Sequence, residues 1–503
     1  MNIYWMSLKD SVPSRGYWDQ HILAETLEEC QEVSNLDGIE ECIVVIPGAY
    51  QFELIDEINR EISKLKKVIV IITSDEENRF PIDKLQHDNI EIYATYPHDT
   101  TKNVKWLPIG YTPHTKKEGL APKKILDVFY QGQINHIDRQ EMYNELKNLE
   151  NVNAEIVPTK GFADGSRIEY IEKMSNSKVV PAPKGNISYD SFRLYEAMEL
   201  GAIPIAQKPS FWDKLYKDVP FPVIEKKEQW RGYIYDAIKD YPVKNNRIQA
   251  WWQRKKIEIK HDIIGYKDMT VIIPISPIPS HPSTEIIDMT IKSIKRWTDS
   301  EIWLLFDGVR QEQEEKRSDY EEFIRNVLWK YNEYPIIFDN HTHQSGMMKN
   351  ILPKIKTPLL MFIEQDTPLV EDELIEIDKR KQFILSGQSN LVRFYHEAFI
   401  HPDHKHLMLN TQDDFTETAQ WSQRPHIAST AFYSRIMSLF SDKTKSFIED
   451  YIHGKEYEDF IHYGYHGWNQ WKTHLYTPKG NIKRSLHSDG RAGSKKFDKN
   501  QIW

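Results

Sequence analysis

The chain has 503 residues, a length that ordinarily divides into two to four domains, each with its own core. Hydrophobic residues make up 40% of it and charged residues 28%, which excludes a disordered or fibrous protein. The formal charge of −10 argues against a protein whose main task is to grip nucleic acid, because that task requires a basic surface.

Cysteine content and hydropathy bear on where the protein works. Cys30 and Cys42 are the only cysteines, so no disulfide framework supports the fold, and a reducing compartment is expected. Residues 1–10 lack the pattern of a secretion signal, and no stretch approaches the roughly 18 apolar residues of a membrane span. We therefore expect a cytoplasmic protein without a transmembrane segment.

In the first half of the chain, short β-branched runs alternate with longer amphipathic stretches, a pattern typical of parallel sheets with crossover helices. The runs form two series, separated by a turn-rich and then polar segment that begins at Leu107. We therefore expect an α/β fold that starts with two Rossmann-like subdomains, residues 1–118 and 119–243. The predicted strands are residues 2–6, 42–46, 68–72 and 90–94, then 126–130, 154–157, 178–181 and 203–206.

The second series contains a long ordered motif from Ser191 to Pro204, Ser-Phe-Arg-Leu-Tyr-Glu-Ala-Met-Glu-Leu-Gly-Ala-Ile-Pro. It predicts a helix that ends at a glycine and leads into a short buried strand. The N-terminus of such a helix offers free backbone N–H groups to a diphosphate, and Arg193 can add a charged fork. Glu196, one turn further on, can accept hydrogen bonds from ribose hydroxyls. The motif therefore indicates a nucleotide site.

This motif resembles the donor-binding segment of exostosin-like GT-B glycosyltransferases and, more loosely, that of phage DNA glucosyltransferases. The segment 127–133, followed by Arg139, resembles the first strand and loop of the same donor domain. The resemblance implies that Gly132 lets the backbone approach a nucleotide sugar and that Arg139 meets a phosphate, without a metal ion. Residues 119–243 would then bind the donor, and residues 1–118 would lie on the acceptor side.

A basic, aromatic linker helix is expected in residues 244–266, where Trp251 and Trp252 stand among several arginines and lysines. Two interpretations remain open. The helix is either a connector whose tryptophans pack against a domain, or a patch that meets an anionic acceptor or lipid headgroups.

The alternating pattern restarts in residues 267–484. A buried strand at 270–275 is followed by a helix whose Ile287, Ile291 and Ile294 share one face. Further strands are expected at residues 301–306, 335–338 and 359–363. Residues 485–503 are polar and form either a mobile tail or a lid.

The last of these strands ends in Glu364-Gln365-Asp366, which places two carboxylates where open α/β sheets bind their ligands. Mg²⁺ and Mn²⁺ prefer oxygen ligands, often one or two carboxylates with phosphate oxygens and water. A cation held there can neutralise a departing diphosphate. The triplet therefore indicates a site for Mn²⁺ or Mg²⁺.

The order of parts in the second half resembles the GT-A glycosyltransferases of family 2. The parts are a Val-Ile-Ile-Pro strand, a strand that ends at Asp307-Gly308, the helix start Gly346-Met347-Met348-Lys349-Asn350, and the strand into Glu364. The resemblance implies that Asp307 contacts the uracil or ribose of a UDP-sugar, that Asp366 binds the metal, and that Glu364 lies beside the metal or ribose. Lys349 would lie near the donor.

The sequence departs from that family at two places. The first strand leads into Ser276-Pro277-Ile278-Pro279-Ser280 instead of a short polar turn, and Phe306 replaces the usual second acidic residue before Gly308. These departures put the contact between Asp307 and the nucleotide base in question.

An inverting transferase needs a carboxylate that takes the proton of the acceptor hydroxyl. The resemblance places this base in an acidic pair at a later helix start. Glu449-Asp450 is the favoured pair, with Asp450 as the base, and Glu458-Asp459 is the competing one. Acidic residues also gather at helix N-termini for the helix dipole alone. By its position, His474 is the expected third metal ligand.

Three hypotheses follow for the whole chain. The first is a bifunctional glycosyltransferase that adds sugars to a glycan acceptor, as polysaccharide biosynthesis requires, with an inverting metal-dependent GT-A site and a metal-independent GT-B site. The second keeps this chemistry but modifies DNA bases, against which the net charge of −10 counts. The third keeps one catalytic GT-A domain and makes the first half a non-catalytic sugar-binding module.

Overall fold

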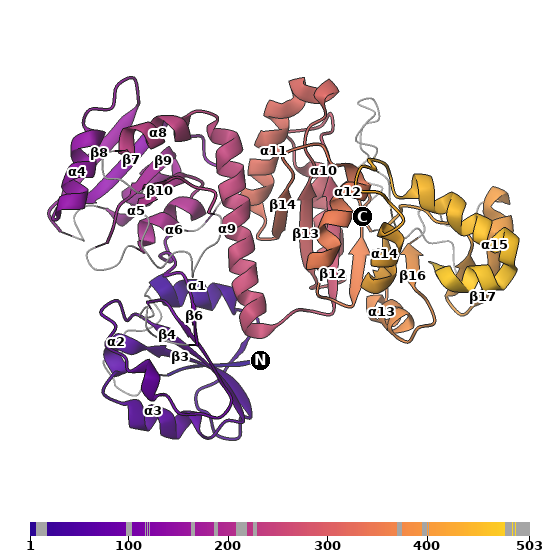
Figure 1. The fold of residues 1–503 in the computed structure, drawn as a ribbon, viewed down its shortest axis with the longest axis horizontal. Coiled ribbons are helices and arrows are strands. Elements are labelled where there is room, and N and C mark those ends of the chain that lie inside the picture. Colours follow the sequence, from indigo (N-terminus) through magenta and orange to yellow (C-terminus); the bar gives the residue numbers. More distant parts are fainter. Residues whose placement is uncertain are drawn as a thin grey trace. The chain divides into compact units, whose positions relative to one another are not determined.

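The computed structural model describes residues 1–6, 18–96, 103–115, 117, 119, 121–161, 166–185, 190–207, 219–224, 229–369, 375–394, 400, 402–477, 485 and 488. The chain forms two compact units, Met1–Gly265 and Tyr266–Trp503 (Figure 1). Within the described ranges, no helix is both long and apolar enough to cross a bilayer.

The first sheet of the first unit is six-stranded and parallel throughout, in the order β2-β1-β3-β4-β5-β6. Its central strands consist of apolar, β-branched runs and are buried on both faces, as expected for a parallel sheet. Helices α1 (Trp18–Thr26), α2 (Gly48–Gln51) and α3 (Ile55–Ile62) belong to this part. The strands are β1 (Asn2–Trp5), β2 (Gln31–Glu32), β3 (Glu41–Pro47), β4 (Lys67–Thr73), β5 (Ile90–Ala94) and β6 (Val104–Trp106).

The second sheet is five-stranded and also parallel, in the order β11-β10-β9-β7-β8. The motif at Ser191 forms α6 (Phe192–Glu199), which ends at Gly201 with φ +68° and leads into β10. The other helices are α4 (Ile137–Leu146), α5 (Arg167–Ser175) and α8 (Trp230–Ile238). The strands are β7 (Leu126–Gln133), β8 (Ala154–Thr159), β9 (Ser177–Ala182), β10 (Ile203–Gln207) and β11 (Val223–Ile224).

Helix α9 (Tyr241–Ile264) packs its tryptophan pair into the core of the first unit. Trp251 and Trp252 are buried, and the Trp252 indole donates to Glu199 Oε1 at 2.6 Å. The hydroxyl of Tyr93, on β5, donates to the carbonyl of Asp262 at 2.9 Å. These contacts support the interpretation of this helix as a connector.

The second unit is built on a nine-stranded mixed sheet, in the order β14-β13-β12-β15-β19-β16-β20-β18-β17. Strands β12 (Met269–Ile275), β13 (Glu301–Phe306), β14 (Tyr334–Ile337) and β15 (Leu359–Phe362) are parallel. Strand β19 (His426–Ser429) is antiparallel to both β15 and β16 (Leu391–Phe394). The sheet continues with β20 (Thr473–Tyr476), β18 (Phe415–Thr418) and β17 (Met408–Gln412).

Helices of the second unit pack their apolar faces against this sheet. In α10 (Glu285–Lys295), Ile287, Ile291 and Ile294 are buried, as their spacing predicts. The remaining helices are α11 (Arg317–Lys330), α12 (His343–Ile351), α13 (Ile377–Leu385), α14 (Thr430–Met437) and α15 (Glu449–Trp471).

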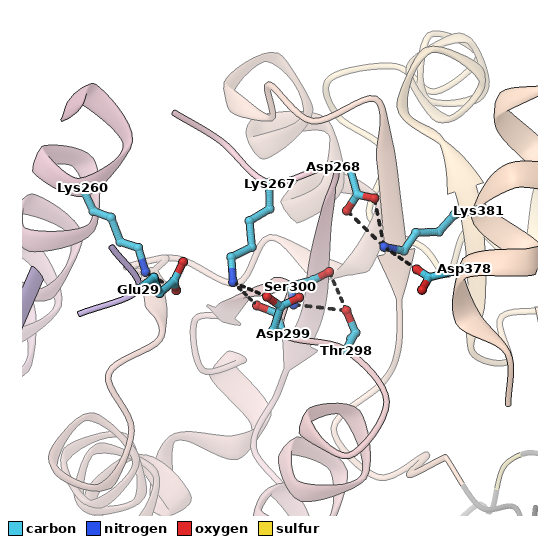
Figure 2. A network of polar contacts seen from close by, with 9 residues as sticks. All are labelled: Glu29, Lys260, Lys267, Asp268, Thr298, Asp299, Ser300, Asp378 and Lys381. Carbon is cyan, nitrogen blue, oxygen red and sulfur yellow. Dashed lines mark hydrogen bonds and ion pairs between the residues drawn. The ribbon is translucent and has the colours of Figure 1, made fainter. Parts of the chain in front are cut away.

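Charged side chains fix the first residues of the second unit (Figure 2). Lys267 Nζ contacts Asp299 Oδ2 at 2.9 Å and donates to its carbonyl at 2.7 Å. Lys381, which is mostly buried, lies between Asp268 and Asp378, with its Nζ at 2.9 and 3.1 Å from their carboxylates. These pairs hold the start of β12 against α13 and the segment before β13. In the first unit, Lys260 pairs with Glu29 at 2.5 Å.

The predicted α/β class is confirmed: two Rossmann-like parallel sheets precede a third α/β part. The third sheet is wider than the predicted parallel strands, because β16 to β20 extend it with antiparallel pairs. The polar C-terminal segment predicted as a tail or lid lies outside the described residues except for Ser485 and Ser488.

Candidate functional site

A cavity of about 280 Å³ lies in the second unit, where β12, β13 and β15 reach their carboxyl ends. These strands are parallel and adjacent, so the residues that follow them meet at one edge of the sheet. The start of α12 and Phe447 complete the wall. The lining includes Ser276, Pro277, Ile278, Pro279, Asp307, Arg310, Gln313, Lys316, His341, His343, Gln344, Glu364, Gln365 and Asp366.

Asp307 lies in this wall, and hydrogen bonds within the protein hold both of its carboxylate oxygens. Oδ1 accepts from the backbone N–H of Gly308 at 2.9 Å and of Thr342 at 2.7 Å. Oδ2 accepts from the N–H of His343 at 3.0 Å and lies 2.9 Å from Nδ1 of His341. The residue therefore caps the N-terminus of α12 and fixes the loop before it.

The glycine after Asp307 is required by this close approach. A Cβ at Gly308 would lie 2.2 Å from the backbone carbon of Asn340, a distance that no side chain tolerates. The Asp-Gly pair at the end of β13 thus joins the strand to α12. The expected contact between Asp307 and a nucleotide base stays a prediction.

Glu364 and Asp366 both line the cavity, as the triplet predicts. Glu364 is half-buried, and its Oε1 accepts from the Gln344 amide at 2.9 Å. Gln344 in turn accepts from the backbone N–H of Ile448, at 3.1 Å, just before α15. Between the two carboxylates, Gln365 donates to the carbonyl of Ser276 at 3.1 Å. The turn is therefore fixed on both sides, and its carboxylates converge on one space.

Two cations line the same cavity, and the sequence did not single them out. Arg310 is exposed and Lys316 half-buried. They bracket the short 3₁₀ segment Gln311–Lys316 between β13 and α11. Burial, with the nearby Arg310 charge, lowers the pKa of His343, so that imidazole is neutral at pH 7. For Arg310 and Lys316, the only signal in the sequence was that they follow a strand predicted to be parallel.

Lys349 lies in α12 but is not among the lining residues. Its Nζ donates to the carbonyl of Phe440 at 2.8 Å and pairs with Asp442 at 2.5 Å. The structure therefore does not bring Lys349 to the cavity.

His474 is also placed elsewhere. It lies in β20, which β19 and β16 separate from β15 in the sheet. The ring is buried edge-on to Phe383 and Trp468, and Nδ1 lies 2.9 Å from Ser389 Oγ. Burial lowers the pKa of His474 to about 4. The residue is thus a neutral core histidine, and it is not among the residues that line the cavity with Glu364 and Asp366.

Glu449 and Asp450 are the first two residues of α15. Glu449 Oε2 accepts from the backbone N–H of Gln423 at 2.9 Å, and Asp450 is exposed. Neither lines the cavity, although Phe447, two residues before Glu449, does. The pair therefore stands at the start of a helix that adjoins the cavity. A catalytic role for Asp450 stays a prediction.

In the first unit, Gly132 lies inside β7 and not in a loop, because β7 continues to Gln133 and pairs with β8 there. A Cβ at Gly132 would lie 2.6 Å from Nη2 of Arg193. That guanidinium donates to the carbonyl of Gln131 at 2.7 Å and lies over the Tyr130 ring, 4.8 Å from its centroid. The glycine therefore makes room for Arg193.

Glu196 and Arg139 lie near the same edge of the second sheet. Glu196 is buried and accepts from Arg167 and, at 3.2 Å, from the Tyr170 hydroxyl. Arg139 donates from Nε to the carbonyl of Lys184 at 3.1 Å, and burial lowers its pKa. The structure thus gathers Arg139, Arg193 and Glu196 near Gly132 at the end of β7, each with contacts inside the protein.

A metal ion at the cavity would need several side-chain ligands or would have to share its shell with other groups. In the parts of the chain that the structure describes, no group of three or more His, Cys, Asp or Glu residues is arranged to hold a metal ion. A cation at Glu364 and Asp366 would therefore complete its shell with phosphate oxygens and water, which is the way Mg²⁺ is usually bound.

No protein-family model matches the chain, and no curated protein matches its sequence. Similar solved structures include S. aureus TarS, at 12% identity over 44% of this chain and 36% of that one, with a TM-score of 0.29. GalNAc-T7 with UDP, GalNAc and Mn²⁺ has 12% identity over 46% of each chain and a TM-score of 0.30. UDP-glucose pyrophosphorylase complexed with UDP-glucose has 8% identity over 43% of this chain and 92% of that one, with a TM-score of 0.27. Likenesses this distant assign neither a family nor an activity, and the chain spans less than half of the first two proteins.

Proposed function

We propose that this chain is a glycosyltransferase of two modules, and that its second unit binds a nucleotide-sugar donor, favoured to be a UDP-sugar, in the cavity beyond β12, β13 and β15. One observation carries the proposal: Glu364 and Asp366 share a single 280 Å³ space with Arg310 and Lys316. A sugar diphosphate with a divalent cation needs both kinds of group, because carboxylates hold the cation and basic side chains hold the phosphates.

Mn²⁺ or Mg²⁺ would supply charge neutralisation of the diphosphate as it leaves. Glu364 and Asp366 are the residues that would hold it, since both offer oxygen ligands and line the cavity. Asp307 keeps α12 and its preceding loop in place around the ligand. Asp450, exposed at the first turn of α15, is proposed to take the proton from the acceptor hydroxyl. The acceptor oxygen then bonds to the anomeric carbon on the face opposite the nucleoside diphosphate, whose bond to that carbon breaks, and the configuration is inverted.

The first unit is proposed to hold a second, metal-independent donor site at Gly132, Arg139, Arg193 and Glu196. Two arginines with a buried glutamate beyond parallel strands support this, because arginine pairs with phosphate and a carboxylate accepts from ribose hydroxyls. A bifunctional enzyme of this kind would extend a glycan acceptor, as polysaccharide biosynthesis requires. Unpaired Cys30 and Cys42 fit the reducing cytoplasm as its location.

The proposal is tested by donor binding to the full-length chain. UDP-, GDP-, CMP- and dTDP-sugars are titrated with Mn²⁺ and with EDTA, against the wild type, Asp366→Asn and Glu364→Gln. We expect Mn²⁺ to strengthen the binding of one donor class to the wild type. In both variants, Mn²⁺ should no longer strengthen this binding. Glu315→Gln is the matched control, because Glu315 is exposed, precedes Lys316 in the chain and is not among the lining residues. Metal-dependent binding that survives Asp366→Asn would contradict the site.

A second pair of variants separates the two modules. Arg193→Ala combined with Glu196→Ala removes two charged side chains of the site proposed in the first unit. Asp366→Asn removes one carboxylate of the site proposed in the second unit. Two transfer activities, each lost in only one of these variants, would support the bifunctional enzyme. Transfer that is abolished by Asp366→Asn and untouched by the double variant would reject a catalytic site in the first unit.

A further inference from the structure

Two cations in the cavity wall carry hydrogen-bond donors that nothing in the described structure uses. Asp307 accepts four contacts from its own surroundings, and Glu364 accepts from Gln344. Arg310 and Lys316 make no side-chain hydrogen bond or ion pair with any other described residue. A guanidinium carries five N–H donors and an ammonium three, and neither can accept a hydrogen bond. Beside the carboxylates of Glu364 and Asp366, the cavity therefore presents unused cationic donors to whatever enters it.

Several cations elsewhere in this unit are already engaged. Arg317, next to Lys316 in the chain, makes a two-bond pair with Glu314. Lys330 pairs with Asp288, and Lys349, the cation that the sequence placed near the donor, pairs with Asp442. The difference is local, since Lys316 and Arg317 are consecutive residues and only the former lines the cavity.

We infer that Arg310 and Lys316 bind the diphosphate group of the ligand. The chemistry suits the two residues, because a guanidinium pairs with two phosphate oxygens at once and an ammonium adds a point charge. This inference rests on the proposed function of the same cavity and adds a consequence. Part of the diphosphate charge is neutralised by side chains, so a nucleoside diphosphate binds even when metal is removed.

The test uses the full-length chain in EDTA with three probes: UDP, uridine and inorganic pyrophosphate. The variants are Arg310→Ala, Lys316→Ala and both together, with Arg317→Ala as the matched control. We expect the double variant to raise the Kd for UDP and pyrophosphate at least about tenfold, since each loss removes a charge-assisted hydrogen bond. Uridine binding and the Arg317→Ala variant should change less than about twofold.

The outcomes separate this inference from the proposed function. Unchanged UDP and pyrophosphate binding in the double variant overturns the role of Arg310 and Lys316 while leaving the donor site in place. Absence of any UDP binding, with or without Mn²⁺, overturns a UDP-sugar as the donor; pyrophosphate binding that depends on the two cations would still support the anion site. Absence of pyrophosphate binding as well overturns both. Thermal unfolding of each variant checks that the fold is kept.

Discussion

The hydroxyl of Thr473 lies between two acceptors, the carbonyl of Thr418 at 2.7 Å and a carboxyl oxygen of Glu456. A hydroxyl has one proton and can donate to only one of them. The second oxygen of Glu456, Oε2, is buried and has no hydrogen-bond partner in the described structure. Burial raises the pKa of Glu456 to about 8, in spite of the Thr473 hydrogen bond and the Arg393 charge, so Glu456 is mostly a neutral acid at pH 7.

A first prediction concerns how stability depends on pH. The folded pKa of about 8 lies above the ordinary value of 4.5, so the unfolded chain loses this proton first. The stabilising contribution is complete below pH 4.5 and disappears as pH rises to about 8. Glu456→Gln keeps an N–H donor without a titrating group. We expect its unfolding free energy, minus that of the wild type, to grow between pH 5 and 8 in urea melts. A constant difference would show that Glu456 is ionised in the fold.

A second prediction concerns the cap on α12. Asp307→Ala leaves the backbone N–H groups of Gly308, Thr342 and His343 without their acceptor. We expect a loss of about 2–4 kcal/mol in unfolding free energy, because an N-cap and a buried charged acceptor disappear together. Asp307→Asn, which keeps one oxygen acceptor, should lose less. Equal losses in the two variants, measured by urea denaturation, would mean that the retained oxygen acceptor contributes nothing, which contradicts a hydrogen-bonded cap.

A third prediction concerns Gly132. An alanine Cβ would displace Nη2 of Arg193 and weaken its bond to the Gln131 carbonyl. We expect Gly132→Ala to cost about 0.5–1.5 kcal/mol in the wild type, the usual worth of such a bond. In an Arg193→Ala background, the same change should cost clearly less. A double-mutant cycle measures this coupling, and a coupling energy of zero would disprove the steric role of the glycine.

A fourth prediction separates His474 from the metal. His474→Ala opens a cavity between Phe383 and Trp468, and we expect it to cost about 1–3 kcal/mol of stability. The Mn²⁺ concentration needed for half-maximal donor binding should stay as in the wild type, because the ring lies in the core. Urea denaturation gives the stability, and isothermal titration gives the Mn²⁺ dependence at a temperature where the variant is folded. A weaker response to Mn²⁺ would restore His474 as a ligand.

The sequence allowed the main strands to be predicted because they are continuous apolar runs, as in β3 and β12. Two-residue strands such as β2 and β11 carry no periodicity and were missed. The resemblance to a donor domain gave Gly132 the role of letting the backbone approach a ligand, whereas here it gives space to a side chain from α6.

For the site, the strand ends were predictable and the long-range placements were not. Asp307, Glu364 and Asp366 follow parallel strands, so their convergence could be inferred from the order of elements. The position of His474 depends on the order of strands in the sheet, which places β19 and β16 in between. Arg310 and Lys316 have no pattern that distinguishes them from other charged surface residues, and only the structure shows that they line the cavity.

The Gln344 side chain links the cavity to the start of α15. Its amide is buried, and it holds Glu364 with one end and the backbone of Ile448 with the other. Neither bond can be released without stranding a buried polar group. A ligand that moves Glu364 would therefore also disturb the hydrogen bond at Ile448, the residue before α15. Because α15 carries Asp450, the proposed base, donor binding would be linked to the place proposed for the acceptor.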